Sequence, residues 1–211
     1  MKNFITIFLI ALSFNAIGQN DAEDLLNHVS KKIKNYDNIS LDFKYTLENP
    51  SENIKQETKG DVVLQGEKYR LNILGVTQLF DGTKLYSIST EDEEVTISSH
   101  VENDTDVITP SKMLSFYEDG YTYTLDIKQD IKGRKIQYVK LTPIDSNSEI
   151  KNILLGIDDQ TKHIYNLIQI GGNGTKTTLT VNSFQTNEQL SKNVFTFDAT
   201  KYEDYYINNL D

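Results

Sequence analysis

The stretch Leu41-Asp42-Phe43-Lys44-Tyr45-Thr46-Leu47-Glu48 alternates apolar and polar side chains without a break. Successive side chains of a β-strand point to opposite faces, so this alternation predicts a strand with one apolar and one polar face. The pattern returns in residues 69–73 and 121–127. Repeated strands of this kind predict a large antiparallel sheet with a single apolar face. What covers that face becomes the functional question.

Turn signals divide the rest of the chain into further short strands. Asp81-Gly82 is a strong hairpin signal, and Gly171-Gly172-Asn173-Gly174 predicts a second hairpin turn. The second turn is not a phosphate loop, because a β-branched run follows it where a helix would be needed. Phe195 and Phe197 alternate once more near the end of the chain. The further strands are expected at about residues 57–64, 68–74, 76–80, 85–89, 95–99, 121–129, 134–142, 150–158, 163–170 and 174–184.

Two helices are expected beside the sheet. The second one is predicted to start at Thr109-Pro110-Ser111, with proline at the first helical position, and to end before Gly120. The first one is predicted from an apolar stripe at helical spacing. We therefore expect an α+β fold, a strongly curved antiparallel sheet forming an open half-barrel, with the N-terminal and central helices as a lid on its concave face. The stripe of the first helix comprises Ala22, Leu25, Leu26, Val29, Ile33 and Tyr36.

The first 18 residues have the pattern of a secretory signal peptide. Lys2 gives a basic start, an apolar run follows, and small residues precede Gln19. Residues 19–211 are then expected to form a single domain. The chain contains no cysteine, which excludes disulfides, thiolate metal sites and a lipid-modified N-terminal cysteine. We expect the exported chain to be located in the periplasm.

Composition and spacing argue against catalysis and against nucleic-acid binding. The formal net charge is −10 and the only arginines are Arg70 and Arg134, a poor match to a phosphate backbone. His28, His100 and His163 lack the spacing of a helical metal motif, and no serine lies in a G-x-S-x-G sequence. We expect no enzyme activity, no cofactor and no metal site.

What remains is apolar surface, because a sheet of about ten strands presents more of it than two helices can cover. On spacing alone, a closed core and a ligand-binding core stay equally open. The side chains expected to contact a ligand are Phe43, Tyr45, Leu47, Tyr69, Leu71, Ile73, Tyr121, Tyr123 and Leu125 in the sheet, and Met113, Leu114, Phe116 and Tyr117 in the central helix.

A series of short motifs, in order, resembles the LolA-like family of periplasmic outer-membrane lipoprotein carrier proteins, over residues 21–211. After the amphipathic helix come residues 39–45, Gly60 to Leu64 and Lys68 to Leu71. The hairpin Phe80-Asp81-Gly82-Thr83-Lys84-Leu85-Tyr86 carries the most specific part of the match. Downstream of it, the set is completed by Leu141-Thr142-Pro143, the strand from Ile153 to Asp158, and Phe195-Thr196-Phe197-Asp198.

This resemblance implies a function in binding and release. The family shields the acyl chains of lipoproteins in an apolar cavity and shuttles them from the inner to the outer membrane. The implied partners are acylated lipoproteins and an inner-membrane lipoprotein-releasing transporter, with the outer-membrane acceptor unknown and the carrier a monomer. The alternatives are a carrier of another lipid or lipophilic small molecule on the same open barrel, or an envelope interaction domain without a ligand.

One departure from the family pattern concerns the lid. Many members carry an Arg-Pro pair, whose arginine helps to hold the lid closed, where this chain has Gln65-Gly66. Arg70 is the nearby candidate for lid control. The hairpin also carries Tyr86 where tryptophan is common in the family.

Overall fold

The computed structural model describes residues 14–99 and 109–210. Most of the predicted signal peptide, residues 1–13, lies outside the described residues, as does His100. The described strands join through backbone hydrogen bonds into one open sheet, in the order β12-β6-β5-β4-β3-β2-β1-β11-β10-β9-β8-β7. They are β1 (Ile39–Asn49), β2 (Ile54–Gln65), β3 (Lys68–Ile73), β4 (Val76–Phe80), β5 (Lys84–Ser89), β6 (Glu94–Ser99), β7 (Tyr121–Ile131), β8 (Arg134–Pro143), β9 (Ile150–Asp158), β10 (Ile164–Gly171), β11 (Lys176–Thr186) and β12 (Tyr206–Asn209).

The predicted strands and both predicted hairpin turns are confirmed. Asp81 closes the β4–β5 turn, because its Oδ1 accepts hydrogen bonds from the backbone N–H groups of Thr83 and Lys84, both at 2.8 Å. Gly174 has a φ of 84° in the β10–β11 turn, a conformation that glycine adopts without strain. The other described elements are the helix α2 (Phe14–Lys34) and the 3₁₀ helices η1 (Pro50–Glu52), η2 (Lys112–Leu114), η3 (Phe116–Glu118) and η4 (Ala199–Tyr202).

The prediction of a central α-helix was wrong. Residues 112–118 form two separate 3₁₀ turns, η2 and η3, interrupted at Ser115, which has a φ of −133°. Thr109 starts the segment as predicted, since its Oγ1 accepts the Lys112 N–H at 3.3 Å. A segment of about ten residues gains too few backbone hydrogen bonds to repay helix nucleation, so short 3₁₀ turns form instead.

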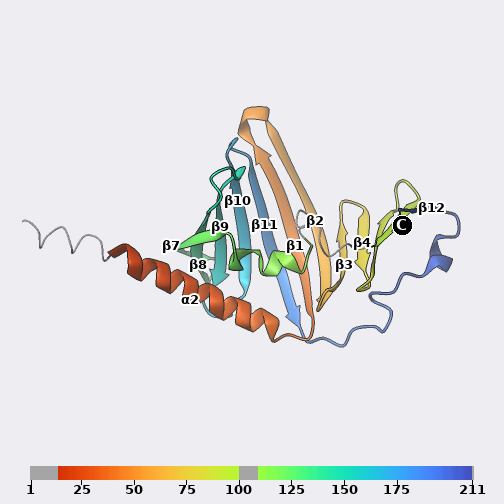
Figure 1. The fold of residues 1–211 in the computed structure, drawn as a ribbon, viewed down its shortest axis with the longest axis horizontal. Coiled ribbons are helices and arrows are strands. Elements are labelled where there is room, and N and C mark those ends of the chain that lie inside the picture. Colours follow the sequence, from red (N-terminus) through yellow and green to blue (C-terminus); the bar gives the residue numbers. More distant parts are fainter. Residues whose placement is uncertain (1–13, 100–108, 211) are drawn as a thin grey trace, which may run out of the picture. The chain divides into compact units, whose positions relative to one another are not determined.

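The contacts divide the chain into two compact units. Unit 1 comprises the described residues 14–34, 47–55 and 117–179, and unit 2 comprises residues 35–46, 56–99, 109–116 and 180–210. Figure 1 shows the elements of both units coloured along the chain.

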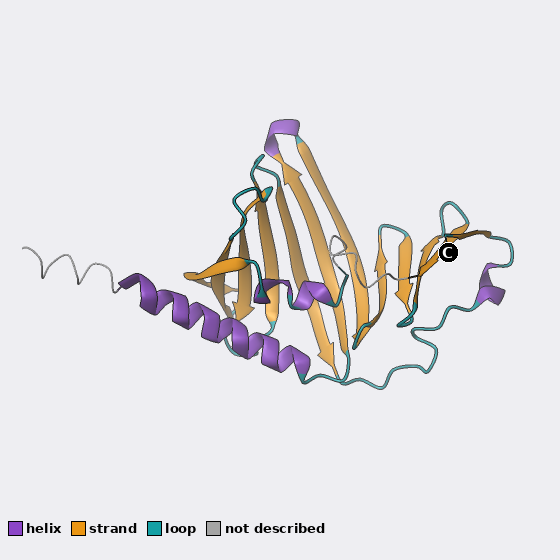
Figure 2. Ribbon diagram, in the orientation of Figure 1, coloured by secondary structure: helices purple, strands orange, loops and turns teal. Residues whose placement is uncertain are grey.

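Unit 1 contains the helix α2, which contacts β7, and the strands β7 to β10. Figure 2 shows α2 as a long regular helix beside these strands. Lys32 near the C-terminal end of α2 fixes the helix to the β9–β10 turn, because its Nζ donates to the Thr161 carbonyl at 2.7 Å. The predicted apolar stripe of this helix is confirmed at its buried members Ala22, Leu26 and Val29. The fully buried side chains of the unit 1 strands are Ile136, Val139, Leu141, Ile153, Leu155 and Ile157.

Unit 2 contains the run of short antiparallel strands from β3 to β6, with part of β1, β2 and β11. The strand β12 adds to β6 in parallel, with Tyr206 opposite Glu94. The buried residues come from both faces of these strands, so both faces are covered. The buried apolar side chains are Ile39, Leu41, Phe43, Val62, Leu64, Tyr69, Leu79, Phe80, Ile88, Val95, Val181 and Phe195.

Candidate functional site

One face of unit 2 is apolar because of the register of its strands. Tyr69 of β3 lies opposite Leu64 of β2 and opposite Phe80 of β4. Residues directly opposite each other in antiparallel strands point to the same side of the sheet. The rings of Tyr69 and Phe80 are in tilted contact, with centroids 5.8 Å apart. We define the apolar face of unit 2 as Phe43, Val62, Leu64, Tyr69, Leu71, Ile73 and Phe80.

Phe43 joins this face through a close approach to a glycine. A Cβ placed on Gly60 would lie 2.5 Å from the Phe43 ring and 2.7 Å from the backbone oxygen of Asn72. Gly60 lies opposite Ile73, so the Phe43 ring lies on the same side as Ile73. Four residues predicted from the sequence, namely Phe43, Tyr69, Leu71 and Ile73, are therefore brought together.

Burial falls along this face from one end to the other. Tyr69 is 3% exposed and Phe43 is 5% exposed, and burial raises the pKa of the Tyr69 hydroxyl. Leu71 and Ile73 are only half-buried, and Leu74 in the following turn is 73% exposed. The face therefore passes from a packed interior to an apolar rim that contacts solvent.

Unit 1 carries the other predicted strand residues in a similar ladder. Tyr123 of β7 lies opposite Leu141, and Leu125 lies opposite Val139. A bulge between Leu125 and Lys128 interrupts the register, and Leu125 is 39% exposed. Tyr121 and Tyr123 are half-buried, and burial raises the pKa of both hydroxyl groups.

Helix α2 is fastened to the η3 turn by a polar cluster around Glu118. The Ser30 hydroxyl donates to Glu118 Oε1, and the Lys34 ammonium lies 2.9 Å from the same carboxylate. The hydrogen bond from Ser30, followed by that from Lys34, lowers the pKa of Glu118. Tyr123 donates its hydroxyl to the Tyr117 carbonyl at 2.7 Å. We call Ser30, Lys34 and Glu118 the clasp.

The predicted lid residues are distributed over both 3₁₀ turns. Tyr117 is 1% exposed within unit 1, where it lines a small cavity of about 160 Å³ with Leu26 and Tyr123. In unit 2, Met113 is 39% exposed, whereas Leu114 and Phe116 are half-buried. Tyr45 and Leu47 continue β1 beyond Phe43 and are also half-buried. A role in ligand contact stays a prediction for all of these residues.

The opposite face of β3 to β5 carries Arg70 together with the buried Leu79 and Ile88, and a part of the chain not expected from the sequence covers it. Residues 187–202, here the C-terminal segment, run across this face. Asn38 Nδ2 donates to the Glu188 carbonyl at 2.9 Å, and the Glu188 N–H donates to Asn38 Oδ1 at 3.0 Å. Phe197 stacks on Tyr86 of β5, with ring centroids 4.5 Å apart. The alternation of Phe195 and Phe197 thus belongs to a non-strand segment.

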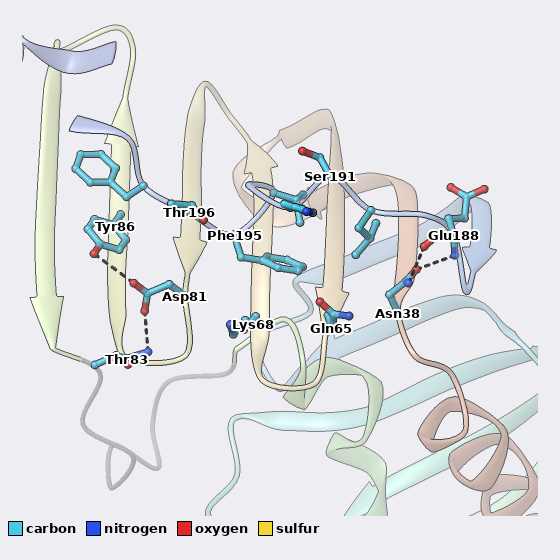
Figure 3. A pocket seen from close by; sticks show the side chains of 14 residues that line it. Asn38, Gln65, Lys68, Asp81, Thr83, Tyr86, Glu188, Ser191, Phe195 and Thr196 are labelled. Atoms are coloured by element: carbon cyan, nitrogen blue, oxygen red, sulfur yellow. Dashed lines mark hydrogen bonds between the residues drawn. The ribbon is translucent and has the colours of Figure 1, made fainter. Parts of the chain in front are cut away.

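A cavity of about 530 Å³ lies between this segment and the strands, and Figure 3 shows its lining. Phe195 points from the segment toward the strands that carry Gln65 and Lys68. Asp81 and Thr83 line the cavity from the β4–β5 turn. The lining is mixed, with aromatic rings from the segment and polar groups from the strands.

A second cavity of about 350 Å³ lies under the same segment and contains Arg70. Arg70 lies on the side of β3 opposite Tyr69, because neighbouring residues of a strand alternate. Thr196 and Phe197 line both cavities. The predicted role of Arg70 in lid control stays a prediction, and the structure places this guanidinium beside the C-terminal segment.

Across residues 14–99 and 109–210, no group of three or more His, Cys, Asp or Glu side chains is placed to hold a metal ion. In that part of the chain, no helix has the length and apolar character needed to cross a bilayer. His28 is exposed on α2, where its Nδ1 lies 2.7 Å from the Asp24 carbonyl oxygen.

Comparison with known proteins gives one family and a set of similar folds. The model of the family "outer membrane lipoprotein carrier protein LolA" matches residues 34–198. An uncharacterized conserved protein from Thermus thermophilus has a TM-score of 0.55 at 11% identity, covering 89% of this chain and 98% of that chain. At this identity the likeness shows the fold alone.

Two further structures are similar with lower scores. A LolA superfamily protein from Nitrosomonas europaea has a TM-score of 0.42 at 14% identity, covering 84% of this chain and 98% of that chain. The lipoprotein LppX of Mycobacterium tuberculosis has a TM-score of 0.49 at 14% identity, covering 80% of this chain and 98% of that chain. A sequence comparison with curated proteins finds no match.

Proposed function

The chain belongs to the family of outer membrane lipoprotein carrier proteins, and we propose that it binds the acyl chains of lipoproteins and carries them across the periplasm. The observation that best supports this function is the apolar face of unit 2, where burial falls from Tyr69 to the half-buried Leu71 and Ile73. The packed end gives stability, and the half-buried end offers apolar contact area to a ligand. The proposed cargo is an acylated lipoprotein received from an inner-membrane transporter and passed on at the outer membrane.

The energetics favour such a carrier. Each acyl CH₂ removed from water contributes about 0.8 kcal/mol, so a triacylated N-terminus does not cross an aqueous compartment unshielded. Release of the cargo also requires contacts that break at low cost. The clasp in unit 1 fits this requirement, because the Lys34 side chain is 62% exposed and exposed ion pairs contribute little. We propose that the clasp opens during loading.

The test is displacement of an environment-sensitive apolar dye by a synthetic triacylated peptide. Leu71→Asp places a carboxylate on the half-buried part of the apolar face and is expected to weaken lipopeptide binding at least tenfold. Leu210→Asp is the matched control, since Leu210 is 64% exposed and lies outside the proposed site. Unchanged binding by Leu71→Asp would reject this face as the acyl site.

The competing functions give different outcomes in the same assay. If the protein carries free lipid, a fatty acid or a phospholipid would displace the dye, but the lipopeptide would not. An envelope interaction domain without a ligand would bind neither the dye nor the lipopeptide. In the cell, depletion of a lipoprotein carrier is expected to leave outer-membrane lipoproteins in the inner membrane.

A further inference from the structure

The two cavities under the C-terminal segment lie on the polar face of β3, the side opposite Tyr69 and Leu71. Lys68 lines the first cavity and Arg70 lines the second. These residues are two positions apart in one strand, so their side chains leave the same face about 7 Å apart. We propose that the cavities bind a phosphate monoester, with Lys68 and Arg70 as the cations that recognise it. This site goes beyond the proposed carriage of acyl chains.

Both cations lack a partner in the described part of the chain. Neither Lys68 nor Arg70 forms a hydrogen bond or an ion pair with another described residue. The chain has 31 acidic residues against 21 basic ones, so acidic partners are abundant. Arg70 is half-buried and pairs with none of the acidic residues in ranges 14–99 and 109–210, so its planar fork of donors stays available there, and this fork matches phosphate oxygens.

Two of the three acidic side chains that line the cavities, Asp81 and Asp198, accept hydrogen bonds from neighbouring residues. Asp81 Oδ1 accepts two backbone N–H groups, and its Oδ2 accepts the Tyr86 hydroxyl at 3.3 Å. Asp198 Oδ1 accepts the backbone N–H and the hydroxyl of Thr200. Glu188 lines the first cavity at the end near Asn38. These carboxylates stay charged, but no ion pair or hydrogen bond joins any of them to Lys68 or Arg70.

The charge and size of the space favour a phosphate monoester over a carboxylate. A monoester carries about −1.5 to −2 charges at neutral pH, which two cations neutralise, whereas a single carboxylate would leave one cation uncompensated. Lys192 of the C-terminal segment adds a further ammonium at the first cavity. A cavity of about 530 Å³ is within the range of small-molecule sites, and the stacked Tyr86 and Phe197 rings offer an apolar wall.

The experiment titrates the full chain with glycerol 3-phosphate and, separately, with dihexanoyl phosphatidic acid, using calorimetry. Lys68→Gln and Arg70→Gln are each expected to weaken binding about tenfold, as the loss of a charge-assisted hydrogen bond implies. Lys59→Gln is the matched control, because Lys59 is exposed and lines neither cavity. Equal binding of the two probes indicates a free phosphate ester as ligand, and tighter binding of the lipid indicates a headgroup; either supports the site.

Two results would overturn the proposal. One is no binding of either probe at millimolar concentration, and the other is equal weakening by Lys59→Gln and Lys68→Gln, which indicates general charge attraction. If circular dichroism shows that Arg70→Gln does not fold, Lys192→Gln replaces it in the titration and is also expected to weaken phosphate binding. Lys192 is exposed on the C-terminal segment, so its substitution should not disturb folding. Lys68→Gln should leave lipopeptide binding unchanged, so failure of this site is distinguishable from failure of the carrier function.

Discussion

Leu141 of unit 1 and Leu71 of unit 2 occupy equivalent places, each in the apolar row of an antiparallel ladder. Leu141 is fully buried between Tyr123 and Ile153, whereas Leu71, opposite Val62, is half-buried. The cover differs as well. Unit 1 has a regular helix, α2, fixed to its strands, while one face of unit 2 is covered by the C-terminal segment, which is irregular before the short 3₁₀ helix η4 and has two cavities beneath it. The same strand pattern therefore builds a more fully buried core in unit 1 and a less completely packed one in unit 2.

The largest contrast is expected from truncating the two leucines. Leu141→Ala should lower the free energy of unfolding by about 4 kcal/mol, because it leaves a cavity in a fully packed core. Leu71→Ala should cost only about 1 kcal/mol, since part of that side chain already contacts water. Urea denaturation of both variants measures the difference. Equal losses would mean that the two units are packed alike.

A second contrast concerns the tolerance of unit 1 to added volume. A Cβ on Gly156 would clash with Asn166 Oδ1 and lie 3.0 Å from both Ile136 and Tyr138. Gly156→Ala is expected to destabilise the chain by about 3 kcal/mol, the cost of overpacking a closed core. Gly172→Ala is the control, because its Cβ would meet only one carbonyl at 3.5 Å. A stable Gly156→Ala variant would show that the side chains around Gly156 can shift to accommodate a methyl group, despite their burial.

A third contrast concerns the cover of unit 2. Phe197 stacks on Tyr86 and on Tyr202, so Phe197→Ala removes two ring contacts that hold the C-terminal segment. The segment should then open more easily, by about 1.5 kcal/mol, without global unfolding. The hydrogen-exchange rates of the backbone amides in residues 187–202 measure this local opening, and the amides of α2 serve as the internal reference. If α2 loses protection to the same extent, the segment is not an independent cover.

The smallest effect is expected at the clasp of unit 1. The pKa of Glu118 is lowered by the hydrogen bonds from Ser30 and Lys34. A lowered folded-state pKa stabilises the fold above the unfolded pKa of about 4.3, and this stabilisation is lost as the pH falls through the folded-state value. Glu118→Gln should therefore lose less than about 1 kcal/mol at pH 7. The gap between wild type and variant should shrink toward pH 3 in denaturation curves. A gap that is constant with pH would contradict the assigned role of the carboxylate.

Alternation predicted the strands β1 to β11 and four residues of the apolar face, because one face of each strand must avoid water, whereas Val62, Leu64, Phe80 and the strand β12 were not predicted. Phe43, Tyr69, Leu71 and Ile73 lie together as expected, since strand register follows from period two. The position of the C-terminal segment could not be predicted in this way. Residues 187–198 form no helix or strand, and Phe197 stacks on Tyr86, which is more than a hundred residues away in the sequence. Residues 112–118 read as a helix because proline and apolar spacing suit a 3₁₀ turn equally well.

The parallel addition of β12 to β6 has a consequence for the order of folding. Tyr206 pairs with Glu94, and the Leu210 N–H donates to the Ile97 carbonyl at 2.9 Å, so β6 lies beside the last strand of the described chain. Closing so long a loop is slow compared with forming the local hairpins β3–β4 and β4–β5. The edge of β6 that pairs with β12 therefore stays unpaired after the β3–β4 and β4–β5 hairpins have formed. During biosynthesis this edge is available for pairing with another chain, and a chaperone that shields it would protect the addition of one four-residue strand.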